Sequence, residues 1–131
     1  MSFDKTKEII MTIGTLQAGS TVPASPGGTE CIDIDMDVSS SLALTMEGTF
    51  SVAGTITAHM RTSPVGGTDP SVWDTQDYTE FDLIAAAAGR EQITKGIWCD
   101  PLYGCVMVVN DGTEVVKNVI VTRTTQDMEA V

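Results

Sequence analysis

The apolar residues of this chain recur with a period of two, and this alternation constrains the fold more than any other feature. The clearest case is the segment 31–38, in which two isoleucines and a methionine alternate with three aspartates. Successive side chains of a β-strand point to opposite faces of its sheet, so the segment predicts a strand with one apolar and one acidic face. Because the same pattern recurs along the 131 residues, the sequence predicts an all-β chain.

Eight segments carry this pattern, and runs rich in glycine, proline, serine and aspartate separate them. The predicted strands are 5–16, 31–38, 42–46, 55–62, 74–83, 92–99, 103–109 and 114–124. Their apolar faces include the set Ile9, Met11 and Ile13 and the set Ile56, Ala58 and Met60. The connections include loops at 18–29 and 63–70, a break at Glu47-Gly48, a turn or short helical cap at 85–88, a hairpin at Asn110-Asp111-Gly112 and a tail at 126–131 that frays.

About eight strands with turn signals every ~8–14 residues are typical of an antiparallel β-sandwich or jelly roll. The length suits one hydrophobic core, so we expect a single domain over residues 1–131.

The chain is strongly acidic, with 18 acidic against 7 basic residues and a net charge of −11. Such a field repels phosphate backbones and anionic lipid headgroups, so we expect neither nucleic acid nor membrane as a partner. The first five residues lack the basic and apolar regions of a signal peptide, and no apolar run approaches the ~20 residues that span a bilayer. We therefore expect synthesis in the cytoplasm.

Three cysteines, Cys31, Cys99 and Cys105, form an odd set without a C-x-x-C pair. This pattern favours neither a disulfide framework nor a four-ligand zinc site, and buried free thiols are expected. A tight turn at 100–104 offers the alternative of a pair between Cys99 and Cys105, although reducing cytoplasm disfavours it.

Two groups of residues are candidate sites. Asp33, Asp35 and Asp37 line one strand face, and we expect a solvated or subunit-contact face there, with a cation site as the alternative. The second group, Trp73, Asp74, Asp77 and Tyr78, combines aromatic and acidic surface and is a candidate ligand or partner surface. The alternative is that Trp73 closes the open end of the sandwich.

Other residues give no support for catalysis. His59 is the sole histidine and lies on the predicted face opposite Ile56, without a serine or cysteine motif of a nucleophile elbow. The glycine pairs at 27–28 and 66–67 lack phosphate-binding spacing. Trp98 and Tyr103 flank a proline turn and are expected to pack. We therefore expect no catalytic residues, no metal and no cofactor.

Four segments together resemble a known class of protein. They are Ala58-His59-Met60-Arg61-Thr62-Ser63, Val72-Trp73-Asp74-Thr75 with Tyr78, the run 103–112, and Val119-Ile120-Val121-Thr122. Over about residues 30–125 the chain resembles small jelly-roll virion proteins of tailed bacteriophages and related archaeal viruses, including capsid decoration and minor head proteins.

The resemblance implies a non-enzymatic structural protein that coats or bridges a capsid lattice. It also implies that the N-terminal strand and loop, residues 1–29, reach a neighbouring subunit. Its implied partners are the major capsid protein or other virion proteins, and copies of itself in a homo-oligomer, with a trimer favoured. The acidity places it on the outer surface of the shell, away from the packaged genome. The alternative is a carbohydrate- or receptor-binding module of a tail or fibre that uses the loop end around Trp73 and Tyr78.

Overall fold

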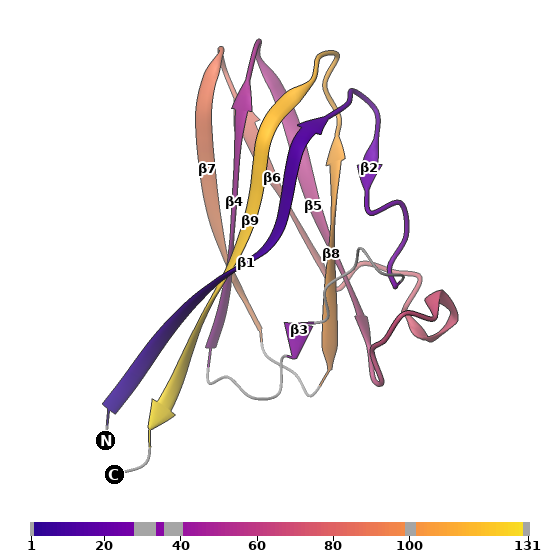
Figure 1. Ribbon diagram of the computed structural model, residues 1–131, viewed down its shortest axis with the longest axis vertical. Helices are drawn as coiled ribbons and strands as arrows, with labels where there is room; N and C mark the ends of the chain where they lie inside the picture. The colour runs from indigo at the N-terminus through magenta and orange to yellow at the C-terminus, as the bar shows by residue number, and fades with distance from the viewer. Residues whose placement is uncertain (1, 28–33, 36–40, 99–101, 130–131) are drawn as a thin grey trace.

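Two antiparallel sheets pack face to face in the computed structural model, which describes residues 2–27, 34–35, 41–98 and 102–129 (Figure 1). Sheet 1 contains β1 (Ser2–Leu16), β9 (Val116–Glu129), β4 (Ser41–Phe50) and β7 (Gly89–Ile97), in that spatial order. Sheet 2 contains β2 (Thr21–Val22), β8 (Tyr103–Asn110), β5 (Gly54–Ser63) and β6 (Thr79–Ala85), and β3 (Ile34–Asp35) also pairs with β8. A 3-10 turn, η1, spans Pro70–Val72.

The connections between these strands give the jelly-roll topology. The chain passes from one sheet to the other after β1, β3, β4, β6, β7 and β8, whereas β5 and β6 pair directly within sheet 2. Alternation between two packed sheets is how a jelly roll covers the inner face of each sheet with the other. The predicted all-β sandwich is confirmed. Among the described residues, no helix is long and apolar enough to cross a membrane.

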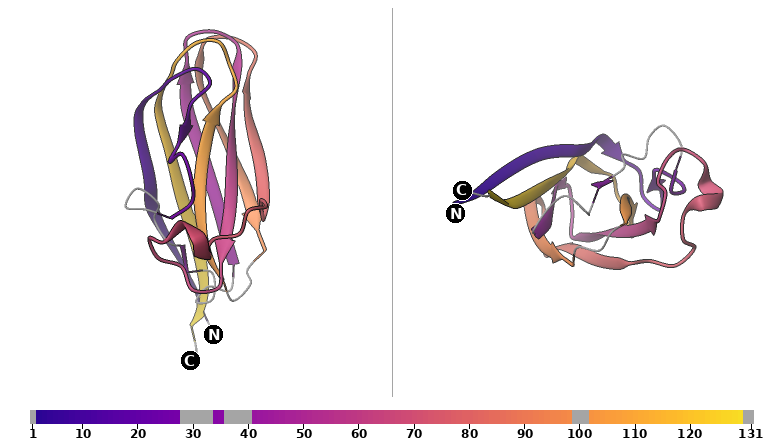
Figure 2. Two further views of the ribbon diagram at one scale, coloured as in Figure 1. Left: turned by 90° about the vertical axis from the view of Figure 1, so that its right-hand side faces the viewer. Right: turned by 90° about the horizontal axis from the view of Figure 1, so that it is seen from below.

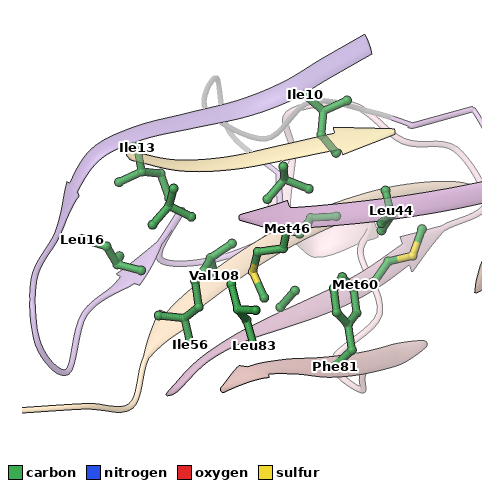
Figure 3. Close-up of a cluster of buried hydrophobic side chains, with 14 of the residues drawn as sticks. Ile10, Ile13, Leu16, Leu44, Met46, Ile56, Met60, Phe81, Leu83 and Val108 are labelled. Atoms are coloured by element: carbon green, nitrogen blue, oxygen red, sulfur yellow. The ribbon is translucent and has the colours of Figure 1, made fainter. Parts of the chain in front are cut away.

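The core lies between the sheets and takes alternate residues from the long strands (Figure 3). The predicted inner face of β5 is confirmed, because Ile56, Ala58 and Met60 are all buried. Leu44 and Met46 of β4 meet them from the opposite sheet. Because side chains alternate along a strand, the intervening residues of β5, His59 among them, lie on the outer face of sheet 2.

The predicted apolar face of the first strand is wrong at Ile9, whereas Ile13 is buried as predicted and Met11 is partly buried against the core. The register of β1 against β9 shifts between Ile9 and Met11, so Ile10 is an additional residue in β1. Because of this bulge, Ile10 is buried at 4% exposure whereas Ile9 is 60% exposed.

The predicted break at Glu47-Gly48 is also wrong, since β4 continues through Gly48 to Phe50. The register of β4 against β9 shifts between Glu47 and Thr49, where Gly48 lies opposite both Asn118 and Val119, so β9 carries the additional residue of a second bulge. A Cβ atom on Gly48 would lie 3.0 Å from Cγ1 of Val116, so glycine allows the strands their close approach. Of the two alternatives for segment 85–88, the turn is confirmed, because the chain bends at 86–88 between the end of β6 at Ala85 and the start of β7 at Gly89.

The predicted hairpin at Asn110-Asp111-Gly112 is wrong, because β8 belongs to sheet 2 and β9 to sheet 1. The buried Asn110 side chain instead organises a crossover between the sheets. Its Nδ2 donates to the carbonyl oxygens of Leu16 and Glu114, and its Oδ1 accepts from the Gly112 amide. These bonds satisfy backbone groups of Gly112 and Glu114, which lie between β8 and β9, and the carbonyl of Leu16 at the end of β1.

The two ends of the chain form a paired ribbon that leaves the sandwich (Figure 1). This terminal ribbon consists of residues 2–9 of β1 paired with residues 122–129 of β9. The predicted fraying of the tail is therefore wrong as far as Glu129. Every described side chain from Lys5 to Ile9 is exposed, so both faces of this part of β1 meet solvent. Seen from below, the terminal ribbon projects at one end of the molecule and the η1 loop at the other (Figure 2).

The core predicts a clear difference between two substitutions. Leu44→Ala removes a fully buried side chain and should lower the free energy of unfolding by about 2–5 kcal/mol. The matched control Ile84→Ala changes an exposed residue of β6 and should stay within about 0.5 kcal/mol. Chemical denaturation measures both. Equal losses would contradict the assigned inner faces.

Candidate functional site

The loop between β5 and β6 carries most of the predicted site residues. It contains η1, which Asp69 caps: its Oδ1 accepts hydrogen bonds from the amide of Ser71 at 3.0 Å and from its hydroxyl at 2.8 Å. These two bonds favour the charged carboxylate and hold the pKa of Asp69 below its usual value. The loop therefore has local structure of its own.

Trp73 anchors this loop to the sheet. Its side chain is 4% exposed, and its Nε1 donates to the carbonyl of Gly67 at 3.1 Å. Together with Cys105 it forms a small second core, against which Val72 and Tyr103 pack. Its ring is covered and offers no surface on which a ligand could stack.

Cys105 is fully buried and disulfide-bonded, so the expectation of a free thiol is wrong at this position. Cys31 and Cys99 lie outside the described residues. The pair between Cys99 and Cys105 therefore stays a prediction.

Asp77 lies at the centre of a polar cluster on the outer face of sheet 2. Its Oδ1 accepts from Nε of Arg61 at 2.6 Å, and its Oδ2 lies 2.8 Å from Nδ1 of His59. Both partners come from β5, where they are the outward residues on either side of the buried Met60. Arg61 also donates from Nη1 to the carbonyl of Asp74 at 3.3 Å.

Glu80 completes the cluster from β6, where it is the direct cross-strand partner of His59. Its Oε2 lies 3.4 Å from Nδ1 of His59. The ligand atoms of His59, Asp77 and Glu80 lie within 4.8 Å of one another, and among the described residues this set can hold a metal ion. Sequence reasoning missed the set because it depends on the pairing of β5 with β6; the one available signal was the shared outer face of His59 and Arg61.

Opposing effects act on the pKa of Asp77. Partial burial raises it, whereas the hydrogen bonds from Arg61 and His59 and the positive charges of those groups lower it. The lowering effects prevail, so the pKa of Asp77 lies below the usual 3.8.

Asp74 and Tyr78 join the ends of the loop to β5. Asp74 accepts from the Thr62 hydroxyl through Oδ2 and donates its amide to the Thr62 carbonyl, both at 2.9 Å. The amide of Tyr78 donates to the Met60 carbonyl at 2.7 Å. Of the four predicted residues, Asp74, Asp77 and Tyr78 therefore border one surface hollow, and Trp73 lies beneath the loop.

Trp98 is 79% exposed, so the expectation that it packs is wrong. Its carbonyl accepts from the Tyr78 hydroxyl at 3.0 Å, and the two residues border a second shallow hollow. The other aromatic of that prediction, Tyr103, is half-buried against Trp73.

The predicted acidic face falls mostly outside the described residues. Asp33 and Asp37 lie there, whereas Asp35 belongs to β3, where it pairs with Tyr103 of β8.

Comparison with known proteins gives structural likeness only. No protein-family model matches the chain. No curated protein matches it. Three similar solved structures are a mitogen of Yersinia pseudotuberculosis, the BFDV capsid protein in a decameric form, and a VP2 subviral particle of infectious bursal disease virus.

The identity to these structures is low. For the mitogen it is 13% over 99% of this chain and 89% of that chain, with a TM-score of 0.43. For the BFDV protein it is 9% over 98% and 99%, with a TM-score of 0.39. For VP2 it is 12% over 95% of this chain and 40% of that chain, with a TM-score of 0.28. These values assign this chain to none of the three proteins.

The polar cluster predicts a pH-dependent effect of Asp77→Asn. At pH 7 the substitution should lower the free energy of unfolding by about 1 kcal/mol, since it removes the ion pair with Arg61. Because folding lowers the pKa of this carboxyl, its contribution is present above pH 3.8 and is lost as the pH falls through the folded-state value.

The measurement is chemical denaturation in a chelator at pH 7 and in steps below pH 3.8. Glu91→Gln makes the same charge change at an exposed position of β7 and should have little effect at either pH. A loss in Asp77→Asn that is the same at every pH would contradict the ion pair.

Proposed function

We propose that this chain is a non-enzymatic structural subunit of a virus particle, a capsid decoration or head-associated protein on the outer surface of the shell. It acts by shape-complementary contacts with other virion proteins and with copies of itself, and it carries out no covalent chemistry. The observation that carries the proposal is the terminal ribbon, which extends a jelly-roll body away from its own core.

In the part of the chain that the structure describes, the outermost part of the terminal ribbon has no third strand beside it. Among the described residues, β4 accompanies β9 only as far as the pair Ser41 with Gln126. The last three pairs, formed by residues 2–4 with 127–129, are then a two-stranded ribbon. Two strands alone are marginally stable in water, so a neighbouring subunit is the natural source of the missing packing.

The charge of the terminal ribbon suits such a contact. Lys5, Lys7 and Ile9 share one face, and their partners on β9 are Gln126, Thr124 and Thr122. This face holds two positive charges, an exposed isoleucine and no carboxylate, in a chain of net charge −11. The only carboxylate of segment 5–9, Glu8, lies on the other face and pairs with Arg123 at 2.7 Å. An acidic surface on a second copy is therefore a complementary partner.

The outer edge of β1 offers a further contact. Among the described residues β1 has a strand partner only in β9, which leaves a row of backbone groups open to pairing. A hollow beside this edge is bordered by Ile10, Ile13, Val22 and Pro23. Backbone groups next to an apolar hollow allow a neighbour to add both strand pairing and side-chain burial.

Charge reversal in the terminal ribbon tests its role in assembly. Light scattering after size-exclusion chromatography should show an oligomer, for which we favour a trimer. The double variant Lys5→Glu, Lys7→Glu should shift it toward the monomer. The control Lys95→Glu, Lys117→Glu makes the same change at exposed positions of β7 and β9 and should keep the oligomer. A monomeric wild-type protein, or equal dissociation in the control, would contradict the role of the terminal ribbon in assembly.

A second candidate function is recognition of a carbohydrate or receptor, as in a tail or fibre module. The exposed ring of Trp98 beside Tyr78 favours it, because an exposed tryptophan is a typical stacking surface. The covered Trp73 cannot serve in this way.

Mass spectrometry of purified particles separates the two functions. A capsid subunit should be present at a copy number that matches the shell lattice. A recognition module should instead be present at the few copies of a tail, and should give a glycan-array signal that Trp98→Ala abolishes. Absence from particles, without a glycan signal, would contradict both.

A further inference from the structure

The cluster of His59, Asp77 and Glu80 has the composition of a metal site. We propose that it binds one divalent transition-metal ion, and that Zn²⁺ is the ion its ligand set favours. The inference is independent of the virion role.

The three ligand atoms converge from separate segments of the chain. His59 comes from β5, Asp77 from the loop and Glu80 from β6. Nδ1 of His59 lies 2.8 Å from Oδ2 of Asp77 and 3.4 Å from Oε2 of Glu80. In a tetrahedral zinc site with bonds of about 2.0–2.1 Å, neighbouring ligand atoms lie about 3.3 Å apart. The carboxylate oxygens of Asp77 and Glu80 lie within 4.8 Å of each other, so side-chain adjustments of up to roughly 1.5 Å would accommodate the ion.

A linear hydrogen bond from Nδ1 of His59 can satisfy only one of the two carboxylates that approach it. A single imidazole nitrogen carries at most one hydrogen, yet two carboxylate oxygens approach the same Nδ1. Arg61 neutralises one of the two carboxylates, so the cluster keeps a net charge of −1 while the imidazole is neutral. A divalent cation in place of that hydrogen would attract all three ligand atoms at once.

Neighbouring groups already orient the ligands. Nε of Arg61 holds Oδ1 of Asp77, which leaves Oδ2 turned toward His59. Arg61 is itself tied to the Asp74 carbonyl, and Trp73 anchors the same loop. Outer hydrogen bonds of this kind, which fix a ligand's rotamer before the ion arrives, are typical of metal sites.

The donor set and the exposure select the type of ion. The site offers one nitrogen and two carboxylates, whereas Ca²⁺ takes six to eight oxygen ligands and Mg²⁺ a near-ideal octahedron. Imidazole with carboxylates suits Zn²⁺, which accepts three protein ligands and a water molecule. The side chains of His59 and Asp77 are 26% and 27% exposed, so the ion and its water can reach the site. Binding would link β5, the loop and β6, and so stabilise the loop by mass action.

Calorimetric titration tests the site on protein prepared without a histidine tag and treated with a chelator. Zn²⁺ should bind with one-to-one stoichiometry near pH 7.5 and raise the melting temperature by several degrees. His59→Ala should abolish this binding, and Glu80→Gln should weaken it at least tenfold.

The matched control is Asp82→Asn. Asp82 is an exposed carboxylate two residues along the same face of β6, but its Oδ1 accepts from the Thr57 hydroxyl at 2.8 Å. Its loss should change zinc affinity by less than about threefold. If Asp82→Asn weakened binding as much as Glu80→Gln, the ion would be held by diffuse charge and the site would be refuted.

The sole histidine provides a readout that does not depend on the stability of any variant. In wild-type protein, Zn²⁺ should shift the ring resonances of His59 in a saturable manner, and Ca²⁺ at the same concentration should not. Unshifted resonances at saturating Zn²⁺, or one-to-one binding that persists in His59→Ala, would overturn the proposal.

Discussion

Burial of one face of each long strand between two sheets is the constraint on which the rest of this structure depends. Leu44 and Met46 face Ile56 and Met60 across the interior, and the alternation of a strand then leaves no choice for the intervening residues. In β5 those residues include His59 and Arg61, which must lie on the outer surface. The polar cluster is thus a consequence of packing on the opposite side of the strand.

Which residues of a strand face the core could be predicted from the sequence wherever the strand has no bulge. The inner face of β5 was predicted correctly because no bulge interrupts this strand. In β1 two adjacent isoleucines, Ile9 and Ile10, fit either face equally well, and the bulge that selects Ile10 depends on the register with β9. Gly48 reads as a break for the same reason, since its role appears only where Val116 approaches it. The local sequence therefore predicts the alternation of a strand, but the position of a bulge depends on the strand that pairs with it.

The candidate site shows the same division between local and distant information. The acidity of the loop and its aromatic residues were visible in the sequence, and closure by Trp73 was among the alternatives. The partners of Asp77 were not predictable, because they lie on another strand and the loop must first be anchored. The exposure of Trp98 was not predictable either, because a tryptophan beside a proline turn has the same sequence signature whether it is covered or exposed.

The net charge of −11 bears on both surfaces, in opposite ways. At physiological ionic strength, charges separated by more than about 8 Å in solvent are largely screened. Repulsion between two whole chains is then weak beside the local field at a contact, so a face with Lys5 and Lys7 can bind an acidic surface of an identical copy. The same surplus of carboxylates gives the His59 cluster its attraction for a cation. The positive face of the terminal ribbon would repel that cation, but the terminal ribbon extends sheet 1 whereas the His59 cluster lies on the outer face of sheet 2. Their separation allows one acidic chain to present a contact for anions and a contact for cations without either neutralising the other.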